Sequence, residues 1–146
     1  MQFINRQDIE IVDIFVRMYG TLIEELAPHS VEPIEFRILK DEENDYRDIM
    51  CRMGRTIYIS PTEAGKIGLS DTEMLAAIAH ETGHIVYQTN PWQPDSEQRA
   101  DMWAAQLGLG SQMISAIEKI LDSRRYKKLT SLLVERIHFL QNMMRG

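Results

Sequence analysis

The sequence has a single cysteine, Cys51, and no long hydrophobic run. One cysteine excludes an internal disulfide and a zinc site built from several thiolates, so a small apolar role is the simplest interpretation of Cys51. No apolar segment approaches the roughly 18 residues that suggest a membrane-spanning helix. The first ten residues also lack the basic and apolar segments of a secretory signal. We therefore expect no membrane span and a cytoplasmic location.

Repeats and linkers are missing too. No internal repeat, low-complexity tract or segment rich in Gly, Ser and Pro divides the 146 residues, so we expect one domain, 1–146. A chain of this length buries roughly 68–70% of its unfolded surface, so a metal is not needed merely to hold the fold. The net charge is −6, although residues 118–146 carry a net charge of +4. This acidic balance argues against general nucleic-acid binding.

Hydrophobic periodicity predicts a helix followed by a small sheet. Over residues 6–27, apolar side chains recur at three- and four-residue steps, which indicates an amphipathic helix that ends before Pro28. Strict alternation over residues 33–39 predicts a half-buried strand. The segment DIMCRM-GR-TIYIS predicts two more strands joined by a tight turn at Gly54-Arg55. We expect these strands to form a small antiparallel sheet.

Capping residues and helix breakers predict several further helices. Ser60-Pro61-Thr62-Glu63 predicts the start of a short helix, and Ser70-Asp71-Thr72-Glu73 has the pattern of a capping box. The helices that follow the short one are expected from Asp71 to about Tyr87, from Asp95 or Ser96 to about Leu107, over residues 112–123 and over residues 129–144. The order of elements predicts an α+β domain.

The helix expected after the capping box carries a pattern typical of zinc sites. His80 and His84 are four residues apart in AHETGH, so both imidazoles can point to one place on the same face. Glu81 lies beside such a metal and can take a proton from its bound water. Shuffling this composition gives only about 0.007 expected matches to H-E-x-x-H. The pattern indicates part of a catalytic zinc site with Glu81 as general base.

A third ligand is expected downstream, because catalytic zinc usually has three protein ligands and one position left for water. In EQRAD, Glu97 and Asp101 are four residues apart on a separate predicted helix. Glu97 can reach the metal while Asp101 accepts a hydrogen bond from the distal nitrogen of a ligand histidine. Small residues on that helix, Ala100 among them, would permit close approach. We predict that His80, His84 and Glu97 bind one Zn²⁺ per chain.

The segments TEMLAAIAHETGH and EQRADMWAAQLG together resemble the gluzincin metallopeptidases, especially the CAAX-prenyl-protease and HtpX-like family, whose pattern is H-E-x-x-H, a spacer and E-x-x-A-D. The similarity covers about residues 55–108, and Gly83 fits the H-E-x-G-H form. The chain lacks the transmembrane helices of those enzymes and is far shorter. The resemblance therefore implies a soluble, minimal zincin-like peptidase acting on a peptide or protein substrate.

A regulatory role is the alternative interpretation. ImmA/IrrE-like regulatory proteases share the zincin core, and a domain of that kind would bind zinc as a regulator or sensor with little or no general proteolysis. Their third-ligand helix more often reads E-x-x-A-N, so Asp101 favours the first family.

Two further parts of a peptidase site have several candidates. A developing oxyanion needs a donor besides the metal, and the candidates are Tyr87, Tyr126 and His138. Tyr87 fits a core aromatic equally well, and His138 lies in a pattern typical of packed helices. An extended peptide can pair with an edge strand through backbone hydrogen bonds. The candidate edge strand comprises Thr56, Ile57, Tyr58 and Ile59, although an interior strand has the same pattern.

Overall fold

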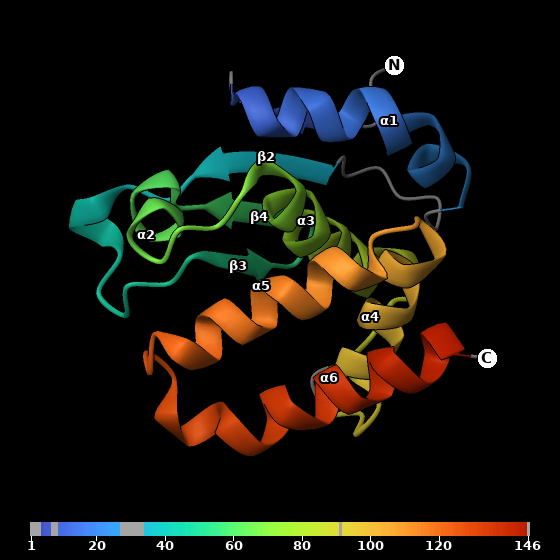
Figure 1. Ribbon diagram of the computed structural model, residues 1–146. Helices are drawn as coiled ribbons and strands as arrows, with labels where there is room; N and C mark the ends of the chain where they lie inside the picture. The colour runs from blue at the N-terminus through green and yellow to red at the C-terminus, as the bar shows by residue number, and fades with distance from the viewer. Residues whose placement is uncertain (1–3, 7–8, 27–33, 91, 146) are drawn as a thin grey trace.

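Helices and strands follow one another as expected for a mixed α and β domain. The computed structural model describes residues 4–6, 9–26, 34–90 and 92–145 (Figure 1). In chain order the main elements are β1 (Ile4–Arg6), α1 (Glu10–Leu26), β2 (Ile34–Ile38), β3 (Met50–Met53), β4 (Thr56–Ile59), α2 (Pro61–Lys66), α3 (Asp71–Val86), α4 (Ser96–Gln106), α5 (Gly110–Asp122) and α6 (Thr130–Arg145). Short 3₁₀ helices lie at Asp41–Glu43 and Lys127–Leu129. Among the described helices, none has both the length and the apolar character required to cross a membrane.

The four-stranded sheet is mixed, so the prediction of an antiparallel sheet is wrong for two of its three strand pairs. The strand order is β1-β2-β4-β3, with β1–β2 and β2–β4 parallel and only β3–β4 antiparallel. The predicted hairpin at Gly54-Arg55 is confirmed, because β3 and β4 pair across that turn. Parallel neighbours need a crossover, and α1 supplies it between β1 and β2. The three-residue strand β1 was not predicted.

Helix α1 covers the sheet with the apolar face that its sequence predicts. Val12, Phe15 and Ile23 are fully buried, and the Phe15 ring lies with its centroid 6.4 Å from that of Phe36 on β2. Burying each such side chain stabilises the fold by about 1.5–3 kcal/mol. Some expected positions lie outside the described residues. These are residues 7–8 and 27 of the helix, its expected stop at Pro28, and residue 33 of the strand.

Side-chain caps fix the start of α2 and α3 where the sequence predicts them. Ser60 Oγ accepts a hydrogen bond from the Glu63 backbone N–H at 3.1 Å. At α3 the capping box is complete, because Ser70 Oγ accepts from the Glu73 N–H at 3.2 Å and the Glu73 carboxylate accepts from the Ser70 N–H at 2.8 Å. Such a cap contributes about 1 kcal/mol to helix stability. The register of the H-E-x-x-H residues on α3 is therefore set from the first turn.

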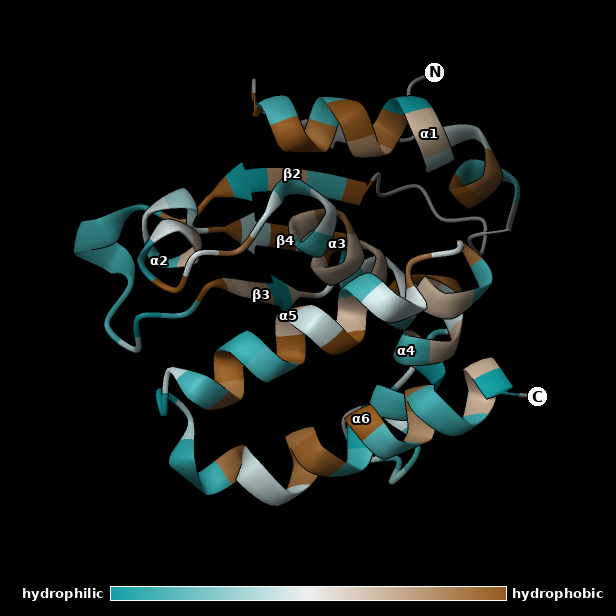
Figure 2. Cartoon of the chain, in the orientation of Figure 1, coloured by the Kyte–Doolittle hydropathy of each residue, from teal (hydrophilic) through white to brown (hydrophobic). Residues whose placement is uncertain are grey.

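Helix α3 is the centre of the helical layer and packs against α1, α4 and α5. Figure 2 shows that α5 and α6 alternate between hydrophobic and hydrophilic residues along their lengths, as helices with one buried face do. Helices α3 and α4 approach each other tightly at Gly83, where an added Cβ would lie 2.9 Å from Ala100 Cα. Because Gly83 has no side chain, α4 can lie close enough for its first turn to reach the histidines.

Candidate metal centre

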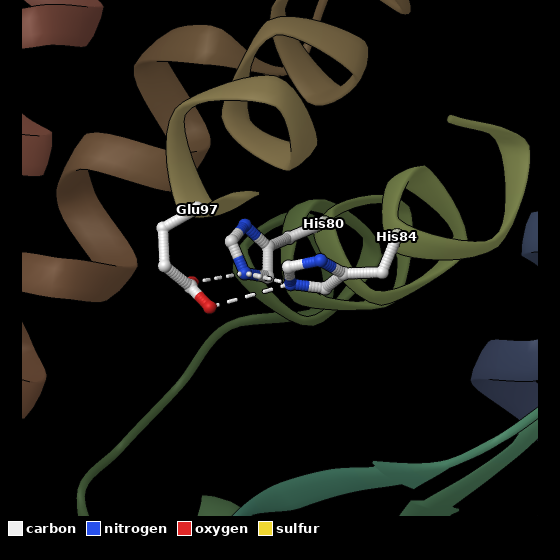
Figure 3. A group of neighbouring side chains, drawn as sticks. All are labelled: His80, His84 and Glu97. Carbon is white, nitrogen blue, oxygen red and sulfur yellow. Dashed lines mark hydrogen bonds and ion pairs between the residues drawn. The ribbon is translucent and has the colours of Figure 1, made fainter. Parts of the chain in front are cut away.

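Two histidines of α3 and one glutamate of α4 converge on a single point. Figure 3 shows the His80 and His84 rings directed toward the Glu97 carboxylate. The two Nε2 atoms lie 3.3 Å apart, and Glu97 oxygens lie 2.9 Å from His80 Nε2 and 3.4 Å from His84 Nε2. One ligand atom from each residue falls within 4.8 Å of the others. The cluster expected from HETGH and EQRAD is thus present in the fold, and it can hold a metal ion.

The spacing of these three atoms fits a small tetrahedral ion. Zinc bonds to imidazole nitrogen and carboxylate oxygen are about 2.0–2.2 Å long, so tetrahedral ligand atoms lie about 3.3–3.5 Å apart. His84 Nε2 lies 3.3 Å from His80 Nε2 and 3.4 Å from Glu97 Oε1, which matches this value, whereas the 2.9 Å contact of His80 Nε2 is with the other carboxylate oxygen, Oε2. The histidines are buried, whereas the Glu97 side chain is 33% exposed. The open side is therefore the side of Glu97.

Each histidine has a partner on the nitrogen that faces away from the cluster. Asp101 Oδ1 lies 2.8 Å from His80 Nδ1, in the position predicted for it. Thr89 Oγ1 lies 2.6 Å from His84 Nδ1. With Nε2 turned toward a metal, each Nδ1 carries the proton and donates it to its partner, which fixes the ring orientation. Thr89, which follows the last turn of α3, was not predicted as a site residue.

Arg136 on α6 binds Asp101, the partner of His80, and was also not predicted from the sequence. Its Nε and Nη2 donate to the two Asp101 oxygens at 2.9 Å each, and Nη2 lies 3.1 Å from His80 Nδ1. Asp101 is fully buried, and an unpaired carboxylate there would be costly. Arg136 therefore neutralises the charge that orients His80. No local motif marks this residue, because it lies 35 positions after Asp101 on an ordinary amphipathic helix.

The charges of the cluster are strongly coupled. Burial and the charge of Arg136 lower the pKa of His80, but hydrogen bonds to Asp101 and Glu97 outweigh them and raise it to about 9. Burial would raise the pKa of Glu97, whereas its hydrogen bonds with His80 and His84 lower it far below the usual range. Without a metal, a proton on His80 and the Glu97 carboxylate therefore form an ion pair. His80 would have to lose that proton in order to bind a metal ion through Nε2.

No protein family, curated protein or solved structure compared with this chain matches it significantly.

Glu81 lies beside the cluster and lines a cavity of about 250 Å³ together with His80 and Glu97. Its carboxylate is partly exposed, and Oε2 is 4.0 Å from Nε of Arg52 on the neighbouring strand β3. A carboxylate in this place can accept a proton from water held between it and the cluster. A larger cavity of about 390 Å³, formed by α1, α2 and the start of α3, includes none of these residues in its described lining.

The three candidate oxyanion donors differ in whether they line the cavity that contains Glu81. Tyr126 lines the same cavity as Glu81, and its hydroxyl donates to Asp48 Oδ1 at 3.4 Å. The Tyr87 hydroxyl donates instead to Gln106 at 2.8 Å, and its ring packs on Trp103. His138 is exposed on α6 and is not among the described residues of the cavity lining.

The edge position expected for the strand Thr56, Ile57, Tyr58 and Ile59 is wrong. This strand, β4, pairs with β2 on one side and β3 on the other, so its backbone groups are used within the sheet. The chain forms β3 at the edge first and then returns as β4 between β2 and β3. Within the described residues, the outer strand next to α3 is therefore β3, which carries the half-buried Cys51.

Proposed function

We propose that this chain is a zinc-dependent metallopeptidase with a minimal zincin-like domain. The observation that supports the proposal most is the convergence of His80 Nε2, His84 Nε2 and one Glu97 oxygen within 4.8 Å, with Glu81 on the adjoining cavity wall. Two imidazoles and one carboxylate with an open side are the donor set of catalytic zinc sites, which keep one position for water. A structural zinc site would use four protein ligands instead.

The residues of the chain have separate roles in this proposal. His80, His84 and Glu97 would hold Zn²⁺, which lowers the pKa of a bound water to about 7 and polarises a carbonyl. Glu81 accepts the proton of the attacking water and later gives it to the leaving amine. Asp101 and Thr89 keep the two imidazoles in the orientation that the donor atoms require.

Metal content tests the site. Purified protein is expected to bind about one zinc per chain, measured by atomic emission and by competition with a chromogenic chelator. His84→Ala removes one of three donors and is expected to reduce the bound zinc to a small fraction, whereas His138→Ala, an exposed residue, is the matched control and keeps it. Equal zinc binding by both variants, or none by the wild type, would contradict the assignment.

Cleavage tests the reaction. The wild type is expected to cleave an unstructured protein such as casein, and Glu81→Gln is expected to lose at least about 10²-fold in rate, because it removes the base while keeping the size of the side chain. Glu118→Gln changes an exposed glutamate of α5 and serves as control. If the zinc-loaded wild type cleaves nothing in a broad peptide library, the regulatory or sensor alternative replaces the peptidase.

A further inference from the structure

The cavity beside the cluster has two chemically different ends. Its polar end is formed by His80, Glu81, Glu97 and Arg136. The remainder is mostly apolar and is walled by side chains from β3, α3, α5 and α6, among them Met50, Ala77, Met113, Ala116, Ile120 and Leu133. Met113, Ala116 and Leu133 are buried core residues. The apolar wall therefore continues the core of the protein up to the candidate metal ligands.

The volume limits what can occupy this space. About 250 Å³ is below the roughly 300–1,000 Å³ of sites for drug-sized ligands. It is larger than the roughly 150 Å³ of an apolar cavity that takes up benzene. One aliphatic or phenyl side chain with its adjoining backbone therefore fits, whereas two large side chains do not.

The charged residues that line the cavity also limit which side chains can occupy it. Glu81, Glu97 and Asp48 are among the residues that line the space, and Glu97 is already paired with His80 and lies 3.8 Å from Arg136. The positive charge of Arg136 is already paired with Asp101. An acidic side chain placed here would lose its hydration and meet like charges, so it is disfavoured.

We infer that this cavity is the specificity pocket of the site and takes a medium-sized apolar side chain, such as that of Leu, Ile, Met or Phe, from the residue flanking the scissile bond. The inference rests on the proposed peptidase function, since the polar end of the cavity holds the groups that would act on that bond. Ile120, Met113 and Leu133 line the same cavity as Glu81, so an apolar side chain seated among them lies in the space that adjoins the candidate metal ligands.

Binding is tested first, without metal and without catalysis. The protein is labelled at its methionine methyl groups, and N-acetyl-leucine amide is added while the methyl NMR signals are recorded. The signals of Met50 and Met113 are expected to shift, whereas that of Met18, which is exposed on α1, stays in place. N-acetyl-glutamate amide is expected to bind at least about tenfold more weakly, since it brings a charge into an acidic, apolar space.

Cleavage then tests the size of the pocket, using peptides that differ only in one residue beside the scissile bond. The wild type is expected to cleave the Leu peptide at least about tenfold faster than the Ala or Glu peptide, compared as kcat/KM. Ala77→Leu fills the space and is expected to reduce cleavage of the Phe peptide more than that of the Ala peptide. Ile120→Ala enlarges the space and is expected to shift the preference toward Phe and Trp.

Ile114→Ala is the matched control. Ile114 is a half-buried residue of α5, the helix of Ile120, and is outside the described lining of the cavity. The inference is overturned if Met50 and Met113 do not respond to the leucine derivative, or if Ile120→Ala and Ala77→Leu change side-chain preference no more than Ile114→Ala does. Methionine shifts without any cleavage would keep the pocket and overturn the peptidase function. Cleavage without side-chain preference would keep the peptidase function and overturn the pocket.

Discussion

Arg136 donates one hydrogen bond to each carboxylate oxygen of Asp101, both at 2.9 Å. Asp101 in turn accepts from His80, so three charged or polar groups from α3, α4 and α6 form one buried chain. Two parallel hydrogen bonds between a guanidinium and a carboxylate fix geometry as well as charge. The last helix is therefore tied directly to the residue that orients a candidate metal ligand.

Removing Arg136 is expected to destabilise the fold strongly. Arg136→Met keeps much of the side-chain volume but removes the guanidinium that binds both oxygens of the fully buried Asp101, which then has His80 beside it. Breaking a buried pair in this way costs about 3–5 kcal/mol in free energy of unfolding. Urea unfolding of the metal-free protein, followed by circular dichroism, measures the change.

The control for this change is Arg99→Met. Arg99 pairs with Asp95 at 2.9 Å, but both side chains are about half exposed, so water screens the pair. Its loss is expected to cost about 0–1 kcal/mol. Similar losses of unfolding free energy in the two variants would show that the buried pair contributes no more to stability than the exposed pair.

The hydrogen bond of Thr89 to His84 is expected to contribute to metal affinity. Thr89→Val keeps the shape of the side chain and removes the oxygen that lies 2.6 Å from His84 Nδ1. Loss of such an outer partner typically lowers affinity about 10–100-fold, because the ring is no longer held in orientation. A zinc competition titration measures it, with Thr130→Val, at the exposed first residue of α6, as control. Unchanged affinity in both variants would argue against this role of Thr89.

Gly83→Ala is expected to disturb both stability and metal binding. The new Cβ would lie 2.9 Å from Ala100 Cα and 3.0 Å from Trp103 Cβ, so the backbone of α4 must move away. Overpacking of this kind costs about 1–3 kcal/mol, and the displaced helix carries Glu97. Gly65→Ala, in α2, meets nothing within 4 Å and is expected to raise stability by about 0.5–1 kcal/mol. Thermal unfolding of the two variants, with and without zinc, measures these changes in stability and metal binding.

Glu73 is expected to link stability to pH. Burial would raise its pKa, but hydrogen bonds from Lys119, Ser115 and Ser70 lower it from 4.5 to about 2. A carboxyl group whose pKa is lower in the folded state adds stability that is complete above about pH 5 and is lost as the pH falls toward 2. The difference in unfolding free energy between the wild type and Glu73→Gln should therefore shrink between pH 5 and pH 2. A constant difference across that window would contradict the assignment.

Sequence patterns predicted the parts of the fold that depend on interactions between residues close together in the chain. The capping box of Ser70 and Glu73, the turn at Gly54 and the four-residue spacing of His80 and His84 depend on neighbours in sequence, and each lies where expected. Glu97 could be placed as well, because α4 follows α3 after a short connection. Gly83 fits the H-E-x-G-H form, and its lack of a side chain permits the tight approach of α4.

Parts that depend on distant contacts were missed. Strand pairing is set by crossovers, so alternation at Ile57 and Ile59 could not tell an interior strand from an edge strand. Arg136 lies in a segment where the neighbouring His138 looked more like a site residue, yet the rotation of α6 turns Arg136 inward and His138 outward. Only packing between helices decides which of two nearby residues faces the site.

The position of Arg136 also has a consequence for the order in which the site is assembled during synthesis. The ribosome releases His80, His84 and Glu97 before α6, and a domain generally folds as a unit. Until α6 docks, Asp101 lacks the guanidinium of Arg136, and the pocket lacks the wall that Leu133 provides. Metal ligands and pocket therefore reach their final arrangement only after the last helix has been made.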